Sequence, residues 1–296
     1  MRPADERPDV GPRRALVVAD LGGTNLRTAL VALDSGDLLA RDTGRTPADD
    51  PHRAIESIRA AAAASPLPVV GGVIGVPGPV SYREGAVRML PNLPLWRDSL
   101  TEALLTDRLG VPTVLANDAD LAALGEHQIG AGRGVEDMVY LTISTGVGGG
   151  AILGGRLAHG ARSIAEVGWM PSGMYVNTSV EEVASGSAMR RRTGWSGEEL
   201  LRRAGAGEPA ALEALQDAAE AIGVAVATVA ALFAPQRIVI GGGFGLAAFD
   251  RLVGPARARL DRLSWMGAPP ELRRAELGDD AGLRGGLPFW ESRMDA

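Results

Sequence analysis

The sequence predicts an α/β protein in which two related domains face a cleft. Two units of strand, glycine turn and strand indicate this, one near residue 20 and one near residue 145, each followed by alternating helices and strands. The length of 296 residues is long for one hydrophobic core and suits two domains. No residue-level repeat relates the halves, so the duplication is one of pattern.

The first half begins with apolar runs at 14–19 and 26–33, which predict buried strands around the glycine turn. We expect a third strand at 37–41, a helix at 51–64 and a strand at 68–76. A helix at 99–109, a strand at 112–116 and a helix at 118–129, capped by Asn117 or Asp118, complete this half.

The second half repeats the opening theme. Strands at 137–144 and 150–153 flank the turn "TGVGGG". A long helix at 208–233 precedes a strand at 237–240 that ends in "GGGFG", and "LGDDAGLRGG" begins a last helix.

Composition excludes several classes of function. The net charge is −6, and the one basic cluster, Arg190–Arg192, falls on a predicted solvated helix face, so we expect no nucleic-acid partner. The absence of cysteine excludes disulfides and thiolate chemistry. The apolar run at 221–234 is too short to span a bilayer, and the first residues lack the apolar core of a secretion signal. We therefore expect a cytoplasmic protein with no membrane partner.

All 30 basic residues are arginine. Without lysine there is no Walker A loop, no kinase of the Val-Ala-Ile-Lys type and no Schiff-base enzyme. Any phosphate must therefore be held by backbone N–H groups, small side chains, arginine or a metal ion.

Three glycine turns follow apolar strands, where α/β sheets bind ligands. One such turn alone is more typical of a hairpin. Three of them favour phosphate binding, because glycines leave backbone amides accessible. Thr24 and Thr145 add hydroxyl donors, and Asp20 suits Mg²⁺.

The stretch "LANDADLAALGE" delivers Asn117 and Asp118 where a strand meets a helix. A helix cap would explain either residue. A carboxylate that shares a cleft with phosphate turns could instead accept the proton of an attacking hydroxyl, as phosphoryl transfer requires.

These motifs together resemble the ROK family (repressors, open reading frames and sugar kinases) of the actin-like ATPase superfamily. The resemblance runs from residue 14 to about 288. It covers "DLGGTNLR" and "LTISTGVGGGAILGGRLAHGA" as phosphate motifs, "GVPGPVSYREGAVRMLPNLPLW" on the sugar side, "NDADLAALGE" around the base, "IVIGGG" near adenosine and the closing "LGDDAGLRGG".

The resemblance implies a two-lobed actin-like ATPase (ribonuclease H-like) fold with a cleft between domains. We expect a flexible tail at 1–13, a smaller domain at 14–117, a larger one at 118–278, and a helix at 279–296 that returns to the first domain. It also implies a homodimer that phosphorylates a sugar with ATP and Mg²⁺.

Residue roles follow from the same resemblance. Asp118 is the expected general base. The expected ATP and Mg²⁺ residues are Asp20, Gly22, Gly23, Thr24, Asn25, Thr145, Gly146, Gly241, Gly242 and Gly243. The expected sugar residues are Gly78, Asn92, Asn117, Asp118, Glu166 and Glu181.

The sequence departs from the family where a histidine and three cysteines bind a structural zinc. Trp169 stands in place of the histidine, and Ser172, Met174 and Ser179 stand in place of the cysteines. These side chains do not make a zinc site, so we predict none. Filling the core is the favoured role for Trp169, and stacking on a sugar is the alternative.

Two other functions compete with a kinase that phosphorylates the 6-OH of glucose, a related hexose or an N-acetylhexosamine. A catalytically weak sugar- or nucleotide-binding pseudokinase or regulator stays open, because the altered loop is where sugar recognition would be lost. The dozen residues before the first strand are too few for a DNA-binding domain. A dinucleotide oxidoreductase does not fit, because the first two glycine turns lead into strands.

Overall fold

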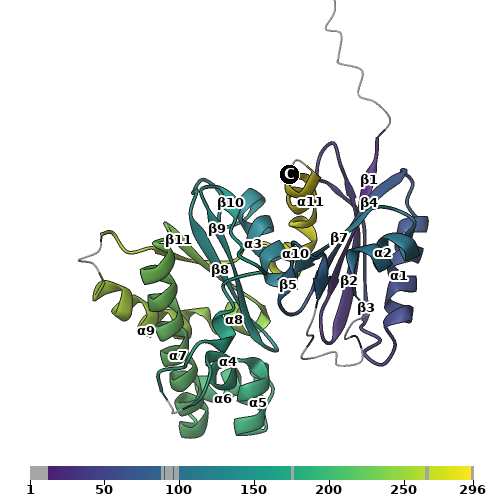
Figure 1. Cartoon of the computed structure of the whole chain (residues 1–296). Coiled ribbons are helices and arrows are strands. Elements are labelled where there is room, and N and C mark those ends of the chain that lie inside the picture. The colour runs from purple at the N-terminus through teal and green to yellow at the C-terminus, as the bar shows by residue number, and fades with distance from the viewer. Residues whose placement is uncertain are drawn as a thin grey trace, which may run out of the picture.

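The computed structural model describes residues 13–87, 90, 96, 100–174, 177–263 and 267–294. It contains two five-stranded sheets (Figure 1). The first has the order β3-β2-β1-β4-β7 and is built from β1 (Ala15–Leu21), β2 (Asn25–Ala32), β3 (Leu38–Arg45), β4 (Val69–Val76) and β7 (Thr113–Asn117). β1, β4 and β7 run parallel, while β2 and β3 pair antiparallel.

The second sheet has the same order and the same strand directions. It runs β10-β9-β8-β11-β12, from β8 (Met138–Ile143), β9 (Val147–Leu153), β10 (Arg156–Leu157), β11 (Arg237–Gly241) and β12 (Glu271–Arg274). β8, β11 and β12 are parallel, and β9 and β10 are antiparallel. The two strand–turn–strand units therefore occupy equivalent places, and the predicted α/β class is confirmed.

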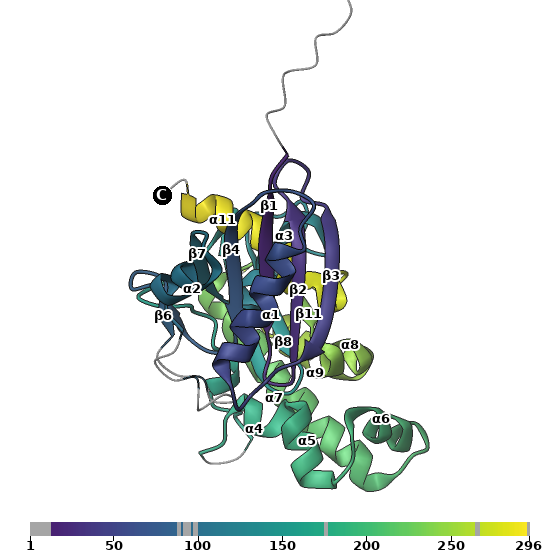
Figure 2. The same cartoon turned by 90° about the vertical axis from the view of Figure 1, so that its right-hand side faces the viewer.

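Helices cover both faces of the first sheet (Figures 1 and 2). α1 (Pro51–Ala63) and α2 (Glu102–Leu109) lie on one face, and α10 (Ala281–Arg284) and α11 (Gly286–Met294) lie on the other. Phe289 and Trp290 of α11 are buried in the same apolar cluster as the strands. The last helix therefore packs on the first sheet.

Helix α3 (Asp118–Ile129) lies between the two sheets and contacts α10 on one side and β8 and β9 on the other. Its far end is held by Glu126, a fully buried carboxylate. Glu126 accepts hydrogen bonds from the backbone N–H groups of Ala131 and Leu277, both at 2.8 Å, and of Glu276 at 3.1 Å. This ties α3 to the segment that leads into α10.

The core beside the second sheet centres on α7 (Pro209–Phe233), which packs against α9 (Phe249–Asp261) and α4 (Val180–Ala184). The apolar run at 221–234 was expected to be too short to span a bilayer. It belongs to α7, which at 25 residues is long and apolar enough to cross a membrane, so that expectation was wrong. Half of the most apolar 18-residue stretch of α7 is buried inside the protein, as in an ordinary core helix. One such helix is weak evidence for membrane insertion.

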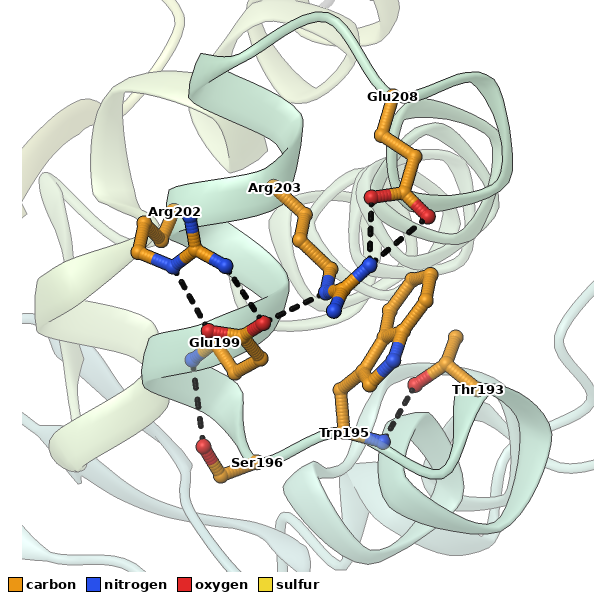
Figure 3. A network of polar contacts seen from close by, with 7 residues as sticks. All are labelled: Thr193, Trp195, Ser196, Glu199, Arg202, Arg203 and Glu208. Carbon is orange, nitrogen blue, oxygen red and sulfur yellow. Dashed lines mark hydrogen bonds and ion pairs between the residues drawn. The ribbon is translucent and has the colours of Figure 1, made fainter.

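A polar network holds α5 (Gly186–Thr193), α6 (Gly197–Gly205) and the start of α7 together (Figure 3). The carboxylate of Glu199 accepts hydrogen bonds from Arg202 at 2.7 Å and Arg203 at 2.6 Å, which lower its pKa to about 2. Arg203 also bonds Glu208 at 2.8 Å and lies 4.5 Å from the ring centre of Trp195. Arg190–Arg192 are exposed, as predicted.

Candidate active site

A cavity of about 410 Å³ is lined by residues of both sheets and of α3. Most of the predicted site residues lie on its wall: Asp20, Gly22, Gly23, Thr24, Asn25, Gly78, Asn117, Asp118, Thr145, Gly146, Glu166, Glu181, Gly242 and Gly243. Residues that are far apart in sequence therefore meet in one place. Asn92 lies outside the described residues.

The first glycine turn joins β1 to β2 and is held from behind by Thr46. Its N–H donates to the Thr24 carbonyl at 2.9 Å, and its hydroxyl donates to the Gly22 carbonyl at 2.6 Å. The Gly22 N–H closes the turn on the Asn25 carbonyl at 2.9 Å. Three hydrogen bonds therefore fix the path of this turn.

The second turn, between β8 and β9, is bonded to Glu181 of α4. The Glu181 carboxylate accepts a hydrogen bond from the Val147 N–H at 2.8 Å. A Cβ atom at Gly146 would lie 2.5 Å from the same carboxylate oxygen, so a larger residue there would displace the Glu181 side chain. Glu181 therefore supports the turn as well as lining the cavity.

The third turn follows β11. Gly242 has a φ of +78°, which glycine adopts readily, and it precedes α8 (Gly243–Ala247). Gly243 has open space at its Cβ position. Gly241 does not line the cavity, contrary to expectation, because it packs behind the turn against the ring of Tyr140.

Asn117 ends β7 and caps α3, so the capping interpretation holds for this residue. Its Oδ1 accepts hydrogen bonds from the N–H groups of Ala119 at 2.9 Å and Asp120 at 3.0 Å. Its Nδ2 donates to the Gly78 carbonyl at 3.0 Å. The amide thus fixes the direction of α3 and joins it to the loop after β4.

Asp118 is the first residue of α3 and lies half-buried on the cavity wall. Burial raises its pKa to about 7, and the charges of Asp20 and Glu166 contribute to this rise. The Ala119 N–H, 2.8 Å from one Asp118 oxygen, lowers the pKa in part. A carboxylate in this range can exchange a proton near neutral pH.

A second carboxyl group, Asp120, is fully buried behind the capping residue. The hydroxyl of Tyr82, from the loop between β5 (Val80–Ser81) and β6 (Ala86–Val87), donates to Asp120 at 2.5 Å and accepts from the Asn117 N–H at 3.2 Å. The other oxygen of Asp120 has no partner among the described residues. Burial raises the pKa of Asp120 to about 8.

Two charged residues that the sequence did not single out also line the cavity, Arg27 and Asp279. The Arg27 guanidinium lies 3.3 Å from the Asp20 carboxylate and 3.2 Å from that of Asp279, in η4 (Gly278–Asp280). Burial raises the pKa of Asp20, and Arg27 lowers it in part. The signal in the sequence was the β1–β2 hairpin, whose register pairs Asp20 with Arg27.

The prediction that Trp169 fills the core was wrong. It ends η2 (Val167–Trp169), the residue is 64% exposed, and it lines the cavity together with Glu166. Burial of Glu166 raises its pKa, and Arg162 lowers it in part. The altered loop thus presents an indole to the site.

The residues at the other expected zinc-ligand positions have structural roles. Ser179 caps α4 in a reciprocal pair with Glu182, and the Ser172 hydroxyl contacts that of Thr178 at 2.7 Å. Met174 is half-buried against the core formed by α7 and α9. The absence of zinc stays a prediction.

The cavity brings three glycine turns together with a carboxylate at a helix start, and the fold around it is shared with known proteins. The ROK family model matches residues 16–293, so the chain belongs to the ROK family. The bifunctional enzyme NanE/NanK of Brucella melitensis is 36% identical over 93% of the chain, which spans about half (53%) of that protein's length.

Two solved structures share the fold. The ROK hexokinase of Thermus thermophilus is 32% identical, with a TM-score of 0.81 over 95% of this chain and 100% of that one. A ROK glucokinase of Streptomyces griseus, solved with glucose and AMPPNP, is 27% identical, with a TM-score of 0.76 over 93% of this chain and 98% of that one. The actin-like ATPase fold is therefore confirmed.

Proposed function

We propose that this chain transfers the γ-phosphoryl group of ATP to a sugar hydroxyl, the 6-OH of glucose, a related hexose or an N-acetylhexosamine. The observation that carries the proposal is the placement of Asp118 at a helix start, on the same wall as the three glycine turns. Its pKa of about 7 suits a group that must take up and release a proton at neutral pH.

The nucleotide side is assigned to the turns. Their backbone N–H groups and the Thr24 and Thr145 hydroxyls would bind the phosphates, and Gly242 and Gly243 would lie against the nucleoside. In the described part of the chain no group of three or more His, Asp or Glu side chains forms a metal cage. Mg²⁺ fits nonetheless, because it needs only one or two carboxylates beside substrate phosphates, and Asp20 would supply one. When bound, Mg²⁺ would neutralise charge on those phosphates.

The sugar side is assigned to Gly78, Asn92, Asn117, Glu166 and Glu181, with Trp169 at its border. As the sugar oxygen attacks, Asp118 accepts the hydroxyl proton. A new O–P bond forms, and the bond from the γ-phosphorus to the bridging oxygen breaks, which releases ADP. Closure of the two lobes would exclude water, which otherwise competes as acceptor.

We also propose a cytoplasmic homodimer with domains at 14–117 and 118–278, the helix at 279–296 on the first domain and no nucleic-acid partner.

The test is Asp118→Asn, which keeps the shape of the side chain and removes the base. Turnover of sugar and ATP should fall by about 10²–10⁴-fold, with sugar and nucleotide affinities unchanged within a few-fold. Asp34→Asn, at a solvent-facing carboxyl paired with Arg13, is the matched control and should keep full activity.

A panel of hexoses and N-acetylhexosamines with Mg²⁺ and ATP then separates the alternatives. Sugar-dependent ADP release supports the kinase. Binding of sugar or nucleotide without any turnover would instead favour the pseudokinase, and an Asp118→Asn enzyme within a few-fold of the parent would remove the base from the mechanism.

A further inference from the structure

The cavity wall carries far more negative than positive charge. Five carboxyl groups line it, those of Asp20, Asp118, Glu166, Glu181 and Asp279. Within the described part of the chain, Arg27 is the one Arg, Lys or His on that wall. A nucleoside triphosphate would add about four negative charges, of which Mg²⁺ offsets two. Among the described residues of the wall, Arg27 is therefore the one side chain whose positive charge could meet a phosphate.

The position of Arg27 suits a phosphate. It lies opposite Asp20 in the β1–β2 register, two residues beyond the first glycine turn, so its side chain emerges beside that turn. The side chain is 19% exposed, and its Nε is buried with no partner among the described residues. One arm contacts Asp20 and the other contacts Asp279, which leaves donor capacity unused.

The contact with Asp279 is the weaker restraint of the two. The side chain of Asp279 is 71% exposed, and an ion pair with so exposed a partner contributes little. Asp20 is only 17% exposed and keeps Arg27 close to the turn. Two oxygens of a phosphate group can accept two parallel N–H hydrogen bonds from one guanidinium group, and such charge-assisted bonds are strong. Exchange of Asp279 for a phosphate oxygen is therefore favourable.

We propose that Arg27 is the positively charged side chain that binds phosphate in this site, and that it exchanges Asp279 for a phosphate oxygen of the bound nucleotide while it stays on Asp20. The inference rests on the proposed kinase function and names the residue that receives the nucleotide.

The test measures binding of AMPPNP with Mg²⁺ by calorimetry, without sugar, to the full chain. Arg27→Gln should raise the Kd by about 10–100-fold, and Arg27→Lys should lie between it and the parent, since an ammonium keeps the charge but loses the fork. Asp279→Asn should keep or lower the Kd, because it removes the competing acceptor.

Arg41→Gln is the matched control. Arg41 of β3 bonds Asp280 of the same η4 segment at 2.8 Å but does not line the cavity. It should bind AMPPNP as the parent does. If Asp279→Asn or Arg41→Gln weakens binding as much as Arg27→Gln, Arg27 only anchors η4 and the inference is overturned. If Arg27→Gln binds normally, the inference fails and the kinase proposal stands, whereas a parent protein without affinity for AMPPNP overturns both.

Discussion

The buried carboxyl of Asp120 makes stability depend on pH in a way that one substitution should remove. The ordinary pKa is 3.8, and in the folded protein burial raises it to about 8, with the charges of Glu166 and Asp118 contributing. Between these values the folded chain holds a proton that the unfolded chain has released. Stability from this group is therefore greatest at low pH and is lost as the pH rises through about 8.

The size of the effect follows from that linkage. For one group of folded pKa about 8, the free energy of unfolding should fall by about 1.4 kcal/mol between pH 7 and pH 9. Asp120→Asn cannot ionise, and its amide oxygen can still accept the Tyr82 hydroxyl hydrogen bond. The variant should match the parent at pH 6, and the same linkage carried from pH 6 to pH 9 should leave it about 2.7 kcal/mol more stable than the parent at pH 9.

The assay is urea unfolding of both proteins at half-unit steps from pH 6 to pH 9. Asp118 and Glu166 are present in both proteins, so the difference in pH dependence between the two measures the part that Asp120 contributes, its coupling to these two charges included. Asp34→Asn, at a surface carboxyl, serves as control and should differ from the parent by a constant amount over this range. A constant difference for Asp120→Asn as well would show that Asp120 is ionised throughout and would refute the reasoning.

Three further predictions concern the site and its supports. The kcat/KM of the parent should fall about tenfold per pH unit below about 7, where Asp118 is protonated, and a flat pH–rate profile down to pH 5 would count against the base. Trp169→Ala should raise the sugar KM by about 5–30-fold and leave the ATP KM and the unfolding midpoint unchanged. The reason is that the exposed indole would add contact area to the sugar but contributes little to the core. An unchanged sugar KM would show that the indole does not contact the sugar. Glu126→Ala should lower the free energy of unfolding by about 3–5 kcal/mol, measured by urea titration. Glu126→Gln should lower it by less, since the amide keeps an acceptor for the three backbone donors. Equal losses in the two variants would contradict the role of Glu126 as a hydrogen-bond acceptor.

The strands and glycine turns were predictable because their signals are local. An apolar run before and after "GGT" specifies a strand, a turn and a strand without reference to distant residues. The placement of Asp118 was equally accessible, because β7 ends and α3 begins at the same two polar residues. Parallel strand ends then bring such residues to one edge of a sheet.

What escaped prediction depends on distant contacts. Trp169 was expected in the core because large aromatic side chains are usually buried, yet only the tertiary path of the loop decides which way the indole points. The Tyr82–Asp120 bond joins residues 38 positions apart. Gly241 and Gly242 are indistinguishable in "GGG", and only the packing of Tyr140 shows that the first of them lies behind the wall.

The shared topology of the two sheets also shows where charge belongs in the site. In the first sheet, one pair back from the end of the β1–β2 hairpin, Asp20 lies opposite Arg27; in the second sheet the equivalent pair of β8 and β9 is Thr142 and Gly148. Both pairs line the cavity, but only the first is charged. The two sheets therefore supply turns of the same backbone path, and the two turns differ in the charge of the side chains beside them. Under the proposed function, the charges of the metal and of the phosphates would be met by side chains of the first sheet, and the second sheet would let its backbone approach the nucleotide closely. A nucleotide that spans the two turns should accordingly respond to charge substitutions at β1 and β2, and to added side-chain bulk at β9.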